Sequence, residues 1–214
     1  MLKVAPNTKE ADMQQKPLGR KNYGPIPHLP GSRMGPGDHK CHEGEARIAT
    51  AKARDKNDEI FVQEKLDGSK CGVARIGDVL HALGRSGYAA ASSPHEQHRH
   101  FSNWAYANLE HFMAVLWDGE RIAVGEFVTP TLLHRGGPLS LDETLKCLGE
   151  RGFHGALDLV EGAVWRVERD KPTGKKGERR RIMDCLVKYV RPGKLDGMYL
   201  PELSGQESVW NWRP

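Results

Sequence analysis

The feature that most constrains this chain is an apolar run that ends in a lysine and a tight turn. Residues 60–62 read Ile-Phe-Val, side chains that favour a strand, and Lys65, Asp67 and Gly68 follow within six positions. An Asp-Gly pair typically forms a turn. The sequence therefore predicts a strand that presents the Lys65 amine beside a carboxylate, an arrangement suited to attack on a phosphate. The alternative is a charged strand end before an ordinary turn.

Attack on phosphate requires an uncharged amine. A lysine amine has an ordinary pKa near 10.4, so about one molecule in a few thousand is a free base at pH 7. Desolvation and neighbouring cations favour the uncharged form. The candidate cations in the sequence are Lys70, Arg85 and Lys188. The candidate carboxylates for a magnesium ion that neutralises a leaving pyrophosphate are Glu126 and Glu161.

Four further segments follow in chain order: GRSGY at 84–88, VGEF at 124–127, EGAVWRVE at 161–168 and LVKYVR at 186–191. With the Lys65 segment, this order resembles the covalent nucleotidyltransferase superfamily, and its ATP-dependent RNA ligases most closely. DNA ligases and mRNA capping enzymes are more distant relatives. The resemblance runs from about Val62 to Arg191 and is carried by the ordered set, because each motif alone arises often by chance.

The resemblance implies a lysyl-AMP mechanism. Lys65 would attack the α-phosphate of ATP, AMP would pass to a 5′-phosphate end, and a 3′-hydroxyl would seal the strand. ATP and Mg²⁺ (or Mn²⁺) are the implied cofactors, and RNA is the implied partner, with DNA as the alternative. The other hypotheses are a DNA nick ligase, a GTP-using capping-type transferase, and a degenerate nucleic-acid-binding protein without turnover.

The same resemblance implies roles for the charged motif residues. Glu161 matches a glutamate associated with the metal and with lysine activation. Lys188 matches a lysine that contacts the α-phosphate, and Arg85 matches an arginine that meets the sugar or phosphate. Lys70 is a further phosphate or ribose contact.

The remaining implied residues shape the nucleotide pocket. Asp67 and Glu126 fall where family members contact the ribose or organise the pocket, and Gly68 permits the tight turn. Glu64 precedes the nucleophile, where the backbone usually reads adenine.

The chain departs from the family pattern at two places. The aromatic-Phe-Asp segment that normally stacks on adenine is not found in the sequence, and Phe127 or Phe153 is the expected substitute. A second lysine is expected two residues after Lys188, where this chain has Val190, and Arg191 is the candidate for the missing charge.

Length and element order predict the architecture. A chain of 214 residues can bury one substantial core, so we expect a nucleotidyltransferase domain over residues 46–214 behind a Pro/Gly-rich arm over residues 1–45. The arm is either an ordered wrap or flexible. Strands and helices without regular βαβ alternation predict a compact α+β fold on antiparallel sheets, which the resemblance makes ATP-grasp-like. The tail after residue 191 is too short for an OB domain.

Local signals place the elements. CGVARI and DVLHAL flank a turn and predict a hairpin. Segments 93–96 and 140–143 read as capping boxes that open helices. The first helix is predicted to bury a stripe of Phe101, Ala105, Leu109, Phe112, Met113 and Leu116. Strands are also expected around residues 121–128, 161–168 and 182–190.

Charge and cysteine use suggest the partners and the compartment. The net charge is +4, and residues 169–181 concentrate Lys and Arg in a predicted loop that is either solvated or in contact with a nucleic-acid backbone. Without an OB domain, the arm, this basic stretch or a partner protein would hold the substrate. Trp210 and Trp212 either pack on the body or stack on bases.

The four cysteines are scattered, which predicts free thiols in a reducing compartment. His39, Cys41 and His42 suggest zinc, but no second ligand pair recurs at finger spacing. There is no apolar run of about 20 residues and no secretory signal, so no membrane partner is predicted and the cytoplasm is the expected location.

Overall fold

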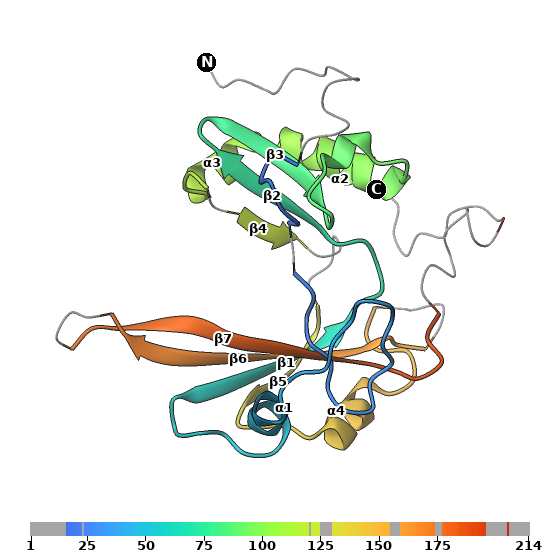
Figure 1. Cartoon of the computed structure of the whole chain (residues 1–214), viewed down its shortest axis with the longest axis vertical. Helices are drawn as coiled ribbons and strands as arrows, with labels where there is room; N and C mark the ends of the chain where they lie inside the picture. Colours follow the sequence, from blue (N-terminus) through green and yellow to red (C-terminus); the bar gives the residue numbers. More distant parts are fainter. Residues whose placement is uncertain are drawn as a thin grey trace. The chain divides into compact units, whose positions relative to one another are not determined.

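The computed structural model describes residues 16–22, 24–119, 121–124, 130–154, 159–173, 177–195 and 205, with the backbone alone for 121–124. The chain divides into two compact units, one formed by residues 1–24 and 68–129 and the other by residues 25–67 and 130–214 (Figure 1). Each unit has its own antiparallel sheet. The predicted α+β class on antiparallel sheets is confirmed.

The first unit is a three-stranded sheet with helices. Its strand order is β3-β2-β4, with β2 at Cys71–Ile76, β3 at Val79–Gly84 and β4 at Arg121–Val124. The predicted hairpin is therefore confirmed. The sheet packs with a short 3-10 turn at Ala90–Ser92 and with helices α2 at Glu96–Ala107 and α3 at Leu109–Val115.

Two helix predictions in this unit need correction. The helix begins at Glu96 rather than at Pro94, and Ser93 uses its hydroxyl to accept from the His95 amide and to bond His98 Nδ1. The predicted single helix is also broken at Asn108, whose side-chain amide donates to the Trp104 carbonyl. The apolar stripe itself is confirmed: Phe101, Ala105 and Leu116 are buried, and the other three members pack against them.

The second unit is a four-stranded sheet of order β5-β1-β6-β7, all antiparallel. Its strands are β1 at Asp58–Lys65, β5 at Leu132–Gly136, β6 at Gly162–Pro172 and β7 at Arg179–Val190. Its helices are α1 at Glu43–Thr50 and α4 at Leu141–Leu148. The capping box of Ser140 and Glu143 is confirmed, and α4 ends before Gly149, which has positive φ.

The two faces of this sheet differ. Strand β1 alternates between buried and half-buried residues, and Ile60, Val62 and Trp165 join a core that includes residues of α1 and α4. Residues directly opposite each other in an antiparallel pair project to the same side. On β6, Gly162 lies opposite Lys65 of β1. Two positions further along β6, Val164 lies opposite Lys188 of β7. The sheet therefore presents both lysines on the face opposite this core.

Part of the N-terminal arm extends the edge of the sheet. The Leu29 amide donates to the Lys188 carbonyl at 2.8 Å, and the Lys188 amide donates to the Pro27 carbonyl at 2.9 Å. These bonds cover the outer edge of β7, which would otherwise leave backbone groups unpaired. The described residues 25–42 are thus an ordered wrap beside Lys188, whereas the domain boundary near residue 45 stays a prediction.

The predicted loop at 169–181 is wrong at both of its ends. Residues 169–172 belong to β6 and 179–181 to β7, with the register continuous from Arg169–Ile182 to Pro172–Arg179. The ladder continues because the two strands hydrogen-bond to each other after β1 has ended. The basic residues therefore lie on a β-ribbon.

The remaining predictions concern thiols, metals and membranes. All four cysteines are free thiols, as expected. Within the described ranges, no group of three or more His, Cys, Asp or Glu side chains is arranged to hold a metal ion, so the His39–Cys41–His42 cluster gives no zinc site. Among the described helices, none has the length and apolarity to span a bilayer.

Candidate active site

Lys65 and Glu161 form the centre of the site. Lys65 is the last residue of β1, and its Nζ lies 2.5 Å from Glu161 Oε2, with the two side chains only 13% and 10% exposed. Burial raises the pKa of the Glu161 carboxyl, and the nearby Lys65 and Lys194 ammonium groups oppose this rise. A lysine amine thus faces a carboxylate with increased proton affinity.

A glycine makes this approach possible. Gly162 follows Glu161, lies opposite Lys65 in the ladder and has φ +156. A Cβ at this position would come within 1.9 Å of the Tyr189 carbonyl oxygen on β7. Only glycine can be accommodated at this close approach of the two strands. At the preceding residue, the Arg191 amide donates to the Glu161 carbonyl at 2.9 Å.

Lys188 is the second lysine on the sheet face that carries Lys65, and residues of the N-terminal segment 25–42 lie around it. Asp38 Oδ1 lies 3.7 Å from Lys188 Nζ, and Asp38 Oδ2 lies 3.1 Å from His28 Nε2. The His28 ring is 1% exposed, and its Nδ1 lies 2.7 Å from the Ser32 hydroxyl. The backbone supports this cluster, since the Gly35 amide donates to Asp38 and the Val190 amide donates to the Ser32 hydroxyl.

The charges in this cluster shift its titration. Burial lowers the pKa of His28, the Lys188 and Lys65 ammonium groups lower it further, and Asp38 opposes the shift. Burial acts to raise the pKa of Asp38, but a hydrogen bond from the Gly35 amide and the charge of Lys188 together hold this pKa below its usual range. The folded protein therefore favours a neutral His28 beside a charged Asp38.

Replacing His28 by glutamine should reduce the loss of stability on acidification. The unfolded chain binds a proton on this histidine below about pH 6.5, whereas the folded chain resists it, so stability falls as the pH drops through this range. Urea unfolding between about pH 7.5 and about pH 5.5 measures the effect. His28→Gln should give a flatter profile, and His39→Gln, at an exposed site, should match the wild type. A wild-type profile for His28→Gln would contradict this account.

Asp67 and Lys194 add a further pair. Asp67 Oδ2 lies 2.8 Å from Lys194 Nζ, and Lys194 is only 8% exposed. Both charges act on the Glu161 carboxyl, Asp67 raising its pKa and Lys194 lowering it. Lys194, His28 and Asp38 were missed by the sequence interpretation. No motif marks them, because they reach the site through folding of segments far from Lys65 in sequence.

Glu64 has a structural anchor role. Its buried carboxylate accepts from the Phe153 amide at 3.1 Å, and a Cβ on Gly152 would come within 2.0 Å of Glu64 Oε1. Its own amide donates to the Thr131 carbonyl at 3.0 Å. The anchored Phe153 side chain is 57% exposed, so one of the two rings expected to stack on adenine is accessible. That the backbone at Glu64 reads adenine, or that Phe153 stacks on it, stays a prediction.

The other predicted residues are distributed over the chain. Gly68, Lys70 and Arg85 belong to the first unit, with Lys70 half-buried and Arg85 exposed in the turn after β3. Glu126 and Phe127 lie outside the described residues, as do Trp210 and Trp212. In the second unit the structure gathers Lys65, Glu161, Asp67 and Lys188.

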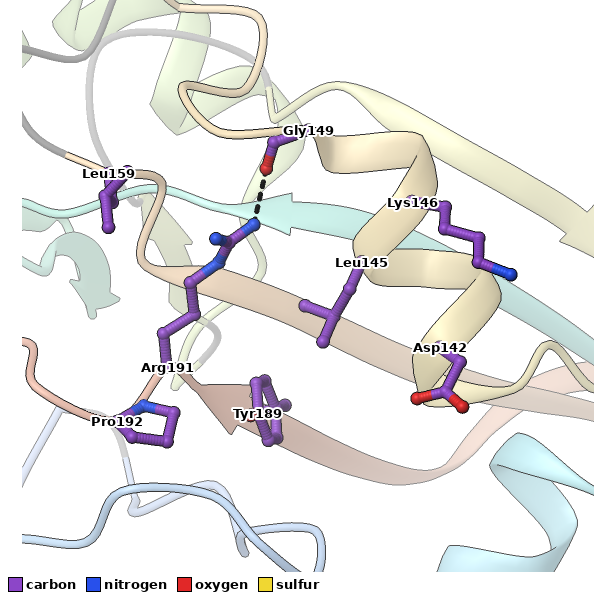
Figure 2. Close-up of a pocket in the computed structure, with 8 residues that line it drawn as sticks. All are labelled: Asp142, Leu145, Lys146, Gly149, Leu159, Tyr189, Arg191 and Pro192. Carbon is purple, nitrogen blue, oxygen red and sulfur yellow. Dashed lines mark hydrogen bonds between the residues drawn. The ribbon is translucent and has the colours of Figure 1, made fainter.

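Arg191 does not supply the charge missing at position 190. Its guanidinium donates to the Gly149 carbonyl at the end of α4 (Figure 2). Val190 shares the face of Lys65, whereas Tyr189 projects to the opposite side, where Arg191 joins it in lining a pocket of about 630 Å³. The other lining residues are Asp142, Leu145, Lys146, Gly149, Leu159 and Pro192. The pocket beside α4 is therefore separate from the Lys65 site.

Comparison with known families adds an independent finding. Residues 58–142 match the sequence model of a family described as RNA ligase. The matched stretch begins with β1 and includes Lys65, Lys70 and Arg85. No curated protein and no solved structure matches the chain significantly.

Proposed function

We propose that this chain, whose residues 58–142 match the RNA ligase family model, is an ATP-dependent ligase that joins RNA ends through lysyl-AMP. The observation that carries the proposal is the contact of 2.5 Å between Lys65 Nζ and the buried Glu161 carboxylate. A nucleic-acid substrate follows from the family. The nucleotide, the covalent intermediate and the ATP-grasp-like architecture are our proposal.

The first step needs the Lys65 amine without its proton. Glu161 is placed to accept that proton, because burial raises its pKa and the two groups are in direct contact. The lone pair of Nζ then attacks the α-phosphorus of ATP. A nitrogen–phosphorus bond forms, the bond from the α-phosphorus to the bridging oxygen breaks, and pyrophosphate leaves with that electron pair.

Lys188 would stabilise the charge that develops on the α-phosphate. It lies on the same sheet face as Lys65, two positions along the ladder, and is 7% exposed. An ammonium group in such a desolvated place interacts with a phosphate more strongly than it would in water. Asp38, 3.7 Å from Lys188 Nζ, would orient this ammonium group.

The described residues fit a magnesium ion held mainly by the substrate. Glu161 is the carboxylate in contact with Lys65, and the Asp67 carboxylate acts electrostatically on Glu161. Magnesium typically takes one or two carboxylates together with waters and phosphate oxygens, which suits a site without a group of three protein ligands in the described ranges. When bound, the metal, Mg²⁺ or Mn²⁺, supplies neutralisation of the leaving pyrophosphate.

The later steps transfer AMP and seal the strand. A 5′-phosphate oxygen attacks the phosphorus of lysyl-AMP, the nitrogen–phosphorus bond breaks, and the Lys65 amine is regenerated. A 3′-hydroxyl then attacks the activated 5′-phosphate, forms the phosphodiester and releases AMP. The Lys188 ammonium would favour both steps by the same electrostatic effect.

Incubation with α-labelled ATP or GTP and magnesium tests the proposed function. We expect ATP to leave a label on the protein that is labile in acid and stable in alkali, as a phosphoramidate is. RNA nicks should then be sealed faster than matched DNA nicks. Labelling by GTP alone would move the protein to capping-type chemistry, and absence of label with both nucleotides would contradict the proposal in favour of a binding protein.

A further inference from the structure

The distal part of the β6–β7 hairpin is a two-stranded arm. Strand β1 pairs with β6 only as far as Arg169, whereas β6 and β7 continue together to the pair Pro172–Arg179. Figure 1 shows these two strands extending past the end of β1. We call the described residues 170–173 and 177–181 the basic arm. It carries the cations Lys171, Arg179, Arg180 and Arg181 against the carboxylates Asp170 and Glu178.

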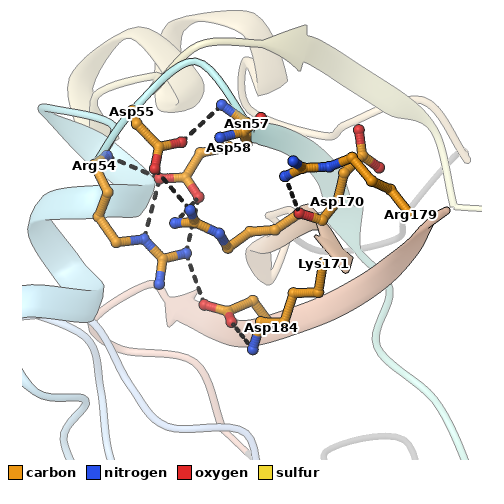
Figure 3. A network of polar contacts seen from close by, with 9 residues as sticks. Arg54, Asp55, Asn57, Asp58, Asp170, Lys171, Arg179 and Asp184 are labelled. Atoms are coloured by element: carbon orange, nitrogen blue, oxygen red, sulfur yellow. Dashed lines mark hydrogen bonds and ion pairs between the residues drawn. The ribbon is translucent and has the colours of Figure 1, made fainter. Parts of the chain in front are cut away.

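An ion network centred on the buried Asp58 side chain holds the basic arm at its root. Asp58, whose side chain is fully buried, accepts from Arg54 and from Arg169, both at 2.8 Å. Asp184 pairs with Arg54 at 2.7 Å and with Lys171 at 3.3 Å. Figure 3 shows Lys171 drawn to Asp184 in this network, while Arg179 lies apart from it. The network therefore fixes the arm and neutralises the cations nearest the sheet.

Arg181 pairs with Glu59, Glu168 and Asp170, which leaves two arginines of the basic arm to consider. Arg179 donates to the Asp170 carbonyl at 2.8 Å, which leaves its charge intact, and Arg180 is exposed opposite Lys171. Within the described residues, neither Arg179 nor Arg180 forms an ion pair. Neighbouring residues of a strand project to opposite sides. The basic arm thus offers, on each of its faces, one guanidinium without an ion pair among the described residues, and that of Arg179 is held by a backbone carbonyl.

The sheet links the arm to Lys65. Strand β6 alternates regularly, and the extra residue in β7, between Met183 and Cys185, lets Arg179 and Arg181 share the face that carries Lys188 and Lys65. Arg166, which lies over the Phe61 ring at 4.7 Å, is on the same face between them. The eight residue-to-residue steps of strand from Asp170 to Gly162 span roughly 26 Å, a continuous surface that leads from the basic arm to Lys65.

We propose that the basic arm binds the phosphate backbone of a single RNA strand, which crosses the arm to contact both Arg179 and Arg180 and then runs from the Arg179 face along β6 toward Lys65. Arginine forms paired hydrogen bonds with phosphate and keeps its charge at all relevant pH values. Holding both guanidinium groups on a fixed ribbon reduces the ordering that binding requires. The choice of RNA rests on the proposed function, but binding to the arm does not require lysyl-AMP.

The test compares Arg179→Ala/Arg180→Ala with a charge-matched control, Lys146→Ala/Arg151→Ala, at exposed sites on and after α4 of the same unit. Binding of a labelled single-stranded RNA oligonucleotide is measured without ATP over a range of salt concentrations. We expect the arm variant to bind at least about tenfold more weakly at low salt, with a salt slope reduced by about 1.4 for two lost phosphate contacts. The control should keep the wild-type slope.

Covalent labelling by ATP separates this inference from the proposed function. The arm variant should label like the wild type yet join RNA ends more slowly, since only substrate capture is impaired. Wild-type RNA affinity and slope in the arm variant would overturn the inference. So would an equal loss in the control, or a loss confined to duplex DNA. If the wild type takes no label, the RNA binding result still decides the role of the arm.

Discussion

Replacing Lys65 by arginine is expected to abolish covalent labelling by ATP, with a loss of at least about a thousandfold. Arginine keeps a positive charge beside Glu161, so the ion pair of 2.5 Å has a substitute and the buried carboxylate is not left alone. The guanidinium remains protonated at neutral pH and has no free amine for attack. The loss therefore reports the missing nucleophile rather than a lost fold.

Lys56→Arg is the matched control, because Lys56 is exposed in the same unit just before β1. This variant should label at the wild-type rate, and circular dichroism should show both variants folded. Lys65→Ala adds a second comparison without the cation. Substantial residual labelling in Lys65→Arg would show that another residue forms the bond.

Replacing Asp58 by alanine is expected to destabilise the second unit by about 3–5 kcal/mol. The Asp58 carboxylate is fully buried and accepts from the Arg54 backbone and side chain and from Arg169. Removing it leaves the Arg54 and Arg169 guanidinium groups, at the root of the basic arm, without their shared carboxylate partner. The hydrogen bonds that the Asp58 carboxylate accepts from Arg54 also raise the pKa of Arg54, so this arginine stays charged.

Urea unfolding followed by circular dichroism measures this loss. Asp78→Ala is the control, because the Asp78 side chain is 90% exposed and its contact with Arg75 is 3.6 Å. Exposed ion pairs contribute about 1 kcal/mol or less. A loss of similar size in the two variants would show that the network at Asp58 is not important for stability.

Local patterns predicted most of the strands and one helix start, because these signals act over a few residues. The apolar run at 60–62 in β1 and the capping box at Ser140 are examples. Predictions failed where distant contacts decide the outcome. The ribbon at 169–172 and 179–181 forms because its strands pair with each other, although glycine, proline and charge indicated a loop. The helix break at Asn108 is different, because it lies at a local contact in which the Asn108 side-chain amide donates to the Trp104 carbonyl.

The site was predictable in part for the same reason. Lys65 and Glu161 belong to ordered motifs, and the structure places them in contact. His28 and Asp38 come from an irregular arm, and they approach Lys188 only because Pro27 and Leu29 pair with the edge of β7. Backbone pairing of this kind leaves no periodic pattern in the sequence. Arg191 was misjudged because successive side chains of a strand point to opposite faces. Arg191 lies on the side opposite Lys65, where it donates to the Gly149 carbonyl.

The central claim is that the Lys65 amine bonds covalently to AMP. Its most direct test is peptide mapping by mass spectrometry of the protein after incubation with ATP and magnesium, under alkaline conditions that preserve a phosphoramidate. The account predicts one AMP group on the peptide that contains Lys65, attached to that side chain. An AMP group on Lys70, Lys188 or another residue, or an unmodified Lys65 peptide in a protein that seals RNA, would contradict it.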